Sequence, residues 1–183
     1  MRTLGPGSIA ALFKLFLDVL YFGLWALLGV TSLIMLLMMI AGVYRLTGLG
    51  PELPAALLQF LAMDVVLALP LAIAAIIALT FIVHRLRLIF DTLKQGDPFV
   101  PDNAGHLRAI AIAIAAYQLI SYASVGMISL FFTIFGRPVE SSINLSPEFS
   151  LNLGAWFAAA VLFVLAEVFS EGARLRAEQK LTI

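Results

Sequence analysis

Cysteine is absent from this chain of 183 residues, and charged residues are scarce. The lack of cysteine excludes disulfides, thiolate metal sites and thiol nucleophiles. Only 12% of the residues are charged and 62% are hydrophobic, whereas soluble domains have about 25% and about 45–50%. The formal net charge is zero, so the chain lacks the basicity typical of proteins that bind nucleic acid directly. The composition predicts an integral membrane protein.

Four long segments carry no charge at all, and each is close to or above the roughly 20 residues of helix that cross the hydrocarbon core. They are residues 19–44, 65–83, 109–136 and 149–166. We therefore predict one all-α domain over residues 1–183, an integral membrane four-helix bundle. Its spans are expected at about residues 17–43, 60–83, 110–135 and 150–170.

The segment between the second and third spans keeps a helical pattern after the membrane ends. Leucine, isoleucine and phenylalanine recur there at intervals of three and four residues, at Leu86, Ile89, Phe90 and Leu93. Gly96 suits a helix end, and Pro101 suits a first helical position. We expect residues 84–108 to form a helical hairpin in the cytoplasm, and residues 171–183 to form a cytoplasmic tail.

The basic residues are distributed unevenly between the two sides that this topology creates. Nine of the eleven lie on the side of the termini and the hairpin, namely Arg2, Lys14, Arg85, Arg87, Lys94, Arg108, Arg174, Arg176 and Lys180. The other two, Arg45 and Arg137, lie in the two remaining loops. Cytoplasmic loops are enriched in lysine and arginine, so both termini are predicted to be cytoplasmic.

Three polar residues within or next to the spans are candidates for a function inside the membrane: Asp64, Gln118 and Glu167. An acid in a span is a functional hypothesis by default, but the uncharged run 65–83 is long enough to place Asp64 at the outer interface, and we favour that position. Gln118 belongs to a polar patch on the third helix, with Tyr117, Ser121, Tyr122 and Ser124. Glu167 lies four residues before Glu171, on a helix face suited to ion pairs with Arg174.

The sequence contains no recognisable catalytic arrangement. Ser124 lacks the glycine pattern of a nucleophile elbow, and no phosphate-binding glycine loop is present. His84 and His106 lie on either side of Gly96 and fall at similar height in the predicted hairpin, but a metal usually needs three or four ligands. We expect a protein that is not an enzyme and that has no catalytic residue, metal or cofactor.

Two stretches resemble a known family. One is LIFDTLKQGDPFVPDNAGHLRAI at residues 88–110, with its spacing of Gly96, Phe99, Asn103 and Leu107. The other is the tail AEVFSEGARLRAEQKLTI, with Phe169, Gly172 and Leu175. Together with four helices in this order, they resemble the bacterial membrane proteins called domain of unknown function 2975. No activity is established for that family, and members are often encoded beside a small helix-turn-helix regulator.

The resemblance implies a multi-pass protein of the bacterial inner membrane, with the lipid bilayer and such a regulator as partners. The residues expected to bind the regulator lie on the cytoplasmic face: Phe99, Leu107, Arg108 and Leu175. The alternative for Phe99 and Leu107 is that they cover the apolar stripe of the hairpin itself. A second hypothesis is a small transporter, channel or lipid-binding bundle that uses Asp64 and the polar patch of the third helix. The sequence gives no oligomeric state.

The position of Asp64 is testable because the chain has no cysteine of its own. We expect the thiol of an Asp64→Cys variant to react with a membrane-impermeant maleimide added outside, since the interface is hydrated. A cysteine placed at Ala74, in the middle of the span, is the control and should react only after solubilisation. Protection of position 64 to the same degree as position 74 would instead place the acid at depth.

Overall fold

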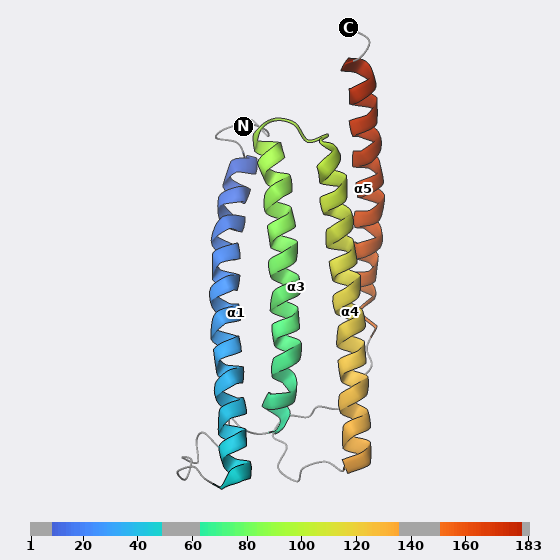
Figure 1. The fold of residues 1–183 in the computed structure, drawn as a ribbon. Coiled ribbons are helices and arrows are strands. Elements are labelled where there is room, and N and C mark those ends of the chain that lie inside the picture. Colours follow the sequence, from blue (N-terminus) through green and yellow to red (C-terminus); the bar gives the residue numbers. More distant parts are fainter. Residues whose placement is uncertain (1–8, 49–62, 136–150, 181–183) are drawn as a thin grey trace. The chain divides into compact units, whose positions relative to one another are not determined.

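The structure is a computed structural model that describes residues 9–48, 63–135 and 151–180 (Figure 1). Nearly all of these residues belong to four long helices. The helices are α1 (Ile9–Thr47), α3 (Met63–Lys94), α4 (Pro101–Phe135) and α5 (Leu153–Lys180). The predicted all-α class is confirmed.

Each helix contains a stretch long and apolar enough to cross a membrane. These stretches are Ile9–Tyr44, Ala68–Lys94, Pro101–Phe131 and Leu153–Gln179. Large apolar side chains lie exposed on the helices, for example Phe22 at 68%, Met127 at 72% and Phe157 at 72%. Such surfaces are rare on soluble proteins and suit contact with lipid chains. The prediction of four helices long and apolar enough to cross a membrane is confirmed, while the bounds of the four spans stay predictions.

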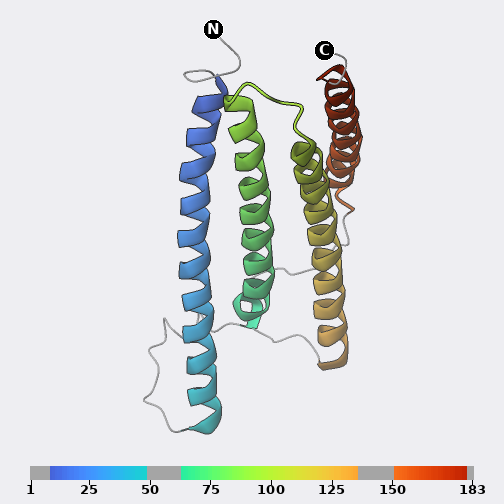
Figure 2. The same ribbon diagram turned by 45° about the horizontal axis from the view of Figure 1, so that its top comes forward.

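The chain divides into two compact units. The first unit comprises the described residues of Met1–Trp25, Ala78–Gln118 and Leu151–Ile183, and the second comprises those of Ala26–Ile77 and Leu119–Ser150. In the first unit, residues 95–100 connect the end of α3 to the start of α4, as Figures 1 and 2 show. The prediction that residues 84–108 stand in the cytoplasm as a hairpin stays a prediction.

Two apolar clusters form the core of the first unit. One contains Ile89, Leu107, Ile110 and Ala166, and so joins α3, α4 and α5. The other contains Leu17, Leu24 and Val83, and joins α1 to α3. Leu17 and Leu24 are seven residues apart, which places them on one face of α1. Leu86, Phe90 and Leu93 pack against these clusters, so the apolar stripe seen in the sequence is covered by the chain itself.

Ion pairs join α1 to α3 beside the second cluster. Lys14 pairs with Asp91, and Nε of Arg87 donates to Oδ1 of Asp18 at 2.5 Å. The Arg87 guanidinium also lies 4.3 Å from the centre of the Tyr21 ring. Lys14 and Asp18 lie four residues apart on one face of α1, a spacing that suits a pair within the helix, but each side chain pairs with an opposite charge on α3 instead.

The end of α3 matches the sequence prediction. Gly96 has a φ of 85°, its amide donates to the carbonyl of Leu93, and the amide of Asp97 donates to the carbonyl of Thr92. This is the Schellman arrangement, in which a residue with positive φ satisfies the last carbonyls of a helix. Pro101 is the first residue of α4, and Asp102 lies in its first turn, as expected.

Two places in the sequence have residues suited to the start of the last helix. Ser146 and Pro147 are a favourable pair for a helix start, and residues 136–150 lie outside the described part of the chain. Residues 151 and 152 are described and are not helical. Oδ1 of Asn152 accepts from the amide of Ala155 at 3.1 Å, so Asn152 caps the helix that begins at Leu153. Ser146 has capping chemistry as well, but it lies outside the described residues.

The positive φ at Gly96 makes a matched pair of glycine substitutions informative. Gly96→Ala should lower the free energy of unfolding by about 1–2 kcal/mol, because a Cβ is unfavourable in the left-handed region. Gly105→Ala, inside α4 and with nothing within 4 Å of the new Cβ, should raise it by about 0.5–1 kcal/mol. Apparent melting of the purified protein in detergent measures both. Opposite signs are expected, and equal destabilisation would contradict the assigned conformations.

Candidate functional site

The turn between α3 and α4 is held by a buried asparagine. Asn103 has no exposed surface. Its Nδ2 donates to Oγ1 of Thr92 at 2.7 Å and to the carbonyl of Pro98 at 2.9 Å. One amide therefore links the last turn of α3, the connecting segment and the first turn of α4. Buried amides need hydrogen bonds to be tolerated, and the two that Nδ2 donates favour one conformation for residues 95–100; Oδ1 of Asn103 is buried without a partner among the described residues.

Helix α5 is fastened to the same turn by two contacts. The ring of Phe99 lies against Gly172, where an added Cβ would meet Cδ1 at 2.6 Å, and its centre is 5.7 Å from that of Phe169. Arg176 pairs with Asp97. The residues of the loop motif and the tail motif thus meet in space, although more than sixty positions separate them in the sequence.

The four residues predicted to bind a partner lie in different environments. Leu107 is 8% exposed and belongs to the core, so for this residue the structure favours the alternative, in which it covers the chain's own stripe. Phe99 is 42% exposed although it packs on Gly172, and Leu175 is 50% exposed. Arg108 forms an exposed pair with Glu167 at 2.9 Å. Phe99, Arg108 and Leu175 retain surface that a partner can reach.

The three polar residues of the membrane hypothesis do not form one site among the described side chains. Asp64 is the second residue of α3, and its side chain lies outside the described part. Gln118 is buried in the first unit. Glu167 is exposed and paired with Arg108, which is a different pair from the Glu171–Arg174–Glu178 series that the spacing predicts and that is also present.

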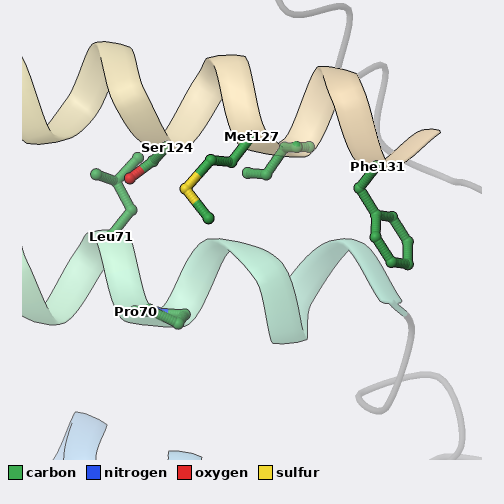
Figure 3. A pocket seen from close by; sticks show the side chains of 6 residues that line it. Pro70, Leu71, Ser124, Met127 and Phe131 are labelled. Carbon is green, nitrogen blue, oxygen red and sulfur yellow. The ribbon is translucent and has the colours of Figure 1, made fainter. Parts of the chain in front are cut away.

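A cavity of about 270 Å³ lies between α3 and α4 in the second unit (Figure 3). It is lined by Pro70, Leu71, Ser124, Met127, Ile128 and Phe131. The Met127 side chain extends from α4 toward α3 (Figure 3), and the Ser124 hydroxyl donates to the carbonyl of Ile120 within its own helix. The lining is therefore almost wholly apolar, as suits hydrocarbon and not an ion.

His106 on α4 lies against the side chain of Arg85 on α3. Its Nδ1 lies 3.3 Å from Nη1 of Arg85, and His84 contacts the Tyr21 ring instead, at 5.7 Å between centres. Arginine is always a donor, so Nδ1 of His106 accepts. Within residues 9–48, 63–135 and 151–180, no group of three or more His, Cys, Asp or Glu side chains is placed to hold a metal.

Comparison with known proteins shows the family of the chain. The family model described as protein of unknown function (DUF2975) matches residues 51–183, which include α3, the turn, α4 and α5. The chain belongs to the DUF2975 family. No curated protein and no solved structure matches it. In this DUF2975 chain the matched region contains the whole turn and its contacts with α5.

Several residues of this turn belong to the two stretches that resemble the family, but the sequence does not show what each of them contacts. Asn103 is one of these residues. A polar residue in the first turn of a helix normally suggests a solvent-exposed position, whereas Asn103 is buried. Gly172 is another, since its small size matters only against the Phe99 ring. The Asp97–Arg176 pair joins residues 79 positions apart. Gly96 and Pro101 mark the turn in the sequence, but Asn103 lies between Asp102 and Ala104, so the sequence gives no sign of its burial.

The close approach of Phe99 to Gly172 gives a testable coupling. Gly172→Ala should lower the free energy of unfolding by about 1–3 kcal/mol, the usual effect of overpacking. Gly154→Ala in the same helix is the control, because its Cβ would lie an ordinary 3.5 Å from Asn152. In the Phe99→Ala background the Gly172→Ala effect should nearly vanish. An undiminished effect in that background would show that the ring is not the obstacle.

Proposed function

We propose that this DUF2975 protein is a non-enzymatic, multi-pass protein of the bacterial inner membrane that binds a small helix-turn-helix regulator at its cytoplasmic end. Both termini and residues 84–108 lie in the cytoplasm in this proposal, and the four helices form one transmembrane bundle. Binding would couple an event in the membrane to transcription.

The orientation is supported by the distribution of charge. All ion pairs among the described residues belong to the first unit, which contains the turn after α3 and the end of α5. Basic residues are retained on the cytoplasmic side, and this is the unit that holds most of them. The positive-inside rule therefore favours placing the turn and the C-terminal helix end in the cytoplasm.

The single observation that carries the binding proposal is the fastening of α5 to the turn. Phe99 on Gly172, the Asp97–Arg176 pair and buried Asn103 hold two distant segments in a fixed relation. A protein surface that is already ordered loses less conformational entropy when a partner binds. Leu175 lies next to these contacts in sequence and is half exposed, so it offers an apolar anchor on an ordered surface.

The test uses the tagged full-length protein, purified from its native membrane in mild detergent. We expect a small helix-turn-helix protein to co-purify, and we expect Leu175→Ser to weaken its binding about tenfold, the loss typical of one buried anchor. Titration of the purified regulator against the purified membrane protein measures that ratio. Leu153→Ser, at the opposite end of the same helix and likewise exposed, is the matched control.

Two results would refute the proposal. One is the absence of any helix-turn-helix protein from the purified complex. The other is a regulator that binds the wild-type protein and Leu175→Ser with equal affinity. Both variants replace an exposed side chain, so neither should disturb the core, and equal melting temperatures would establish this.

A further inference from the structure

Arg85 differs from most of the basic residues described in the first unit; Lys94 also has no carboxylate at ion-pair distance among the described residues, but it is exposed, whereas Arg85 is partly buried. Five others each pair with a carboxylate, and they are Lys14, Arg87, Arg108, Arg174 and Arg176. Within the described part of the chain, Arg85 has no carboxylate at ion-pair distance. Its Nη1 donates to Nδ1 of His106 at 3.3 Å, and its guanidinium lies over the Phe81 ring at 4.9 Å.

This leaves a permanent charge without a counter-ion in the part of the chain that the structure describes. Arginine stays protonated in proteins, and Arg85 is only partly exposed. Its Nε is buried and has no hydrogen-bond partner among the described residues. A neutral imidazole and an aromatic face stabilise a guanidinium only partly, whereas a buried charge normally needs an opposite charge. The environment of Arg85 is thus suited to an anion from outside the chain.

The groups around Arg85 offer an anion more hydrogen-bond donors than acceptors. Because Nδ1 of His106 accepts from Arg85, a neutral His106 carries its proton on Nε2 and can donate there. His84, Arg85 and Asp102 are the charged or titratable groups that act on His106 electrostatically. Asp102 is the single acid among them. The nearby carboxylate of Asp18 is already engaged by Arg87.

The position along α3 indicates which anion is within reach. The uncharged run 65–83 ends two residues before Arg85, and Val83 is 2% exposed in the core. Arg85 therefore lies where the apolar span meets water, which is the depth of phospholipid phosphates. Basic groups between membrane helices at this depth bind anionic lipid headgroups, and arginine matches phosphate with two parallel hydrogen bonds.

We propose that Arg85, with His106 beside it, binds a phosphate oxyanion at the membrane surface. The phosphate belongs either to an anionic phospholipid or to a soluble phosphate, which present the same oxygens to the guanidinium. This inference does not depend on the regulator, because none of its residues belongs to the surface around Leu175. It also holds for either orientation of the protein, since both membrane surfaces carry phosphates.

The experiment measures lipid binding to the delipidated, purified full-length protein by native mass spectrometry. Phosphatidylglycerol is titrated first, and phosphatidylcholine, whose phosphate is balanced by its own cation, is titrated beside it. Arg85→Gln should bind phosphatidylglycerol about tenfold or more weakly, the loss expected of a charge-assisted hydrogen bond. Arg174→Gln removes an equal charge from an exposed, carboxylate-paired site and should bind as the wild type does.

Inorganic phosphate at millimolar concentration distinguishes the two sources. Displacement of phosphatidylglycerol by phosphate from the wild type identifies a site that takes soluble phosphate, and retention identifies a headgroup site. Equal affinities of Arg85→Gln and the wild type would overturn the proposal, as would an equal loss in Arg174→Gln. If Arg85→Gln does not fold, the wild type alone decides: equal binding of phosphatidylglycerol and phosphatidylcholine overturns the proposal, and a tenfold preference for phosphatidylglycerol supports it.

Discussion

The exclusion of charge from hydrocarbon governs the organisation of this protein. An uncompensated charge within the bilayer costs several kcal/mol, so ionisable residues gather where the helices leave the lipid. Every ion pair among the described residues lies in the first unit. The second unit presents apolar side chains and an apolar cavity. Directional contacts, and with them the specific geometry of the fold, are therefore concentrated in the first unit.

Within the first unit, three residues form a connected system at the turn. Gly96 closes α3, Asn103 joins α3 to α4, and Gly172 lets the Phe99 ring pack against α5. Each requires a particular residue type, because left-handed backbone, a two-donor amide and a missing Cβ have few substitutes. Several of the motif residues that resemble the DUF2975 family, among them Gly96, Phe99, Asn103 and Gly172, belong to this turn or contact it. In this chain these residues have an architectural role, and any partner must bind to the surface that they leave exposed.

If the phosphate that we propose for Arg85 belongs to a phospholipid, the lipid is both solvent and ligand for Arg85. A guanidinium at the end of an apolar span extends toward the headgroups, while its aliphatic part remains in apolar surroundings. Its neighbour Arg87, two residues further along, is satisfied by Asp18 on α1. Two arginines on one helix turn thus have different partners, Asp18 on α1 for Arg87 and His106 on α4 for Arg85.

The sequence alone determined the four helices, the cap at Gly96 and the start of α4 at Pro101. These features depend on local chemistry: hydrogen bonds between residues four apart, backbone conformation at single residues, and the length of uncharged runs. The tertiary structure alone decided that Lys14 and Asp18 pair with α3, that Leu107 is buried, that Asn103 spans the turn and that Asp97 meets Arg176. Those contacts depend on the rotation of each helix about its axis against its neighbours, and four helices with similar all-round apolar surfaces carry too weak a periodic signal to specify it.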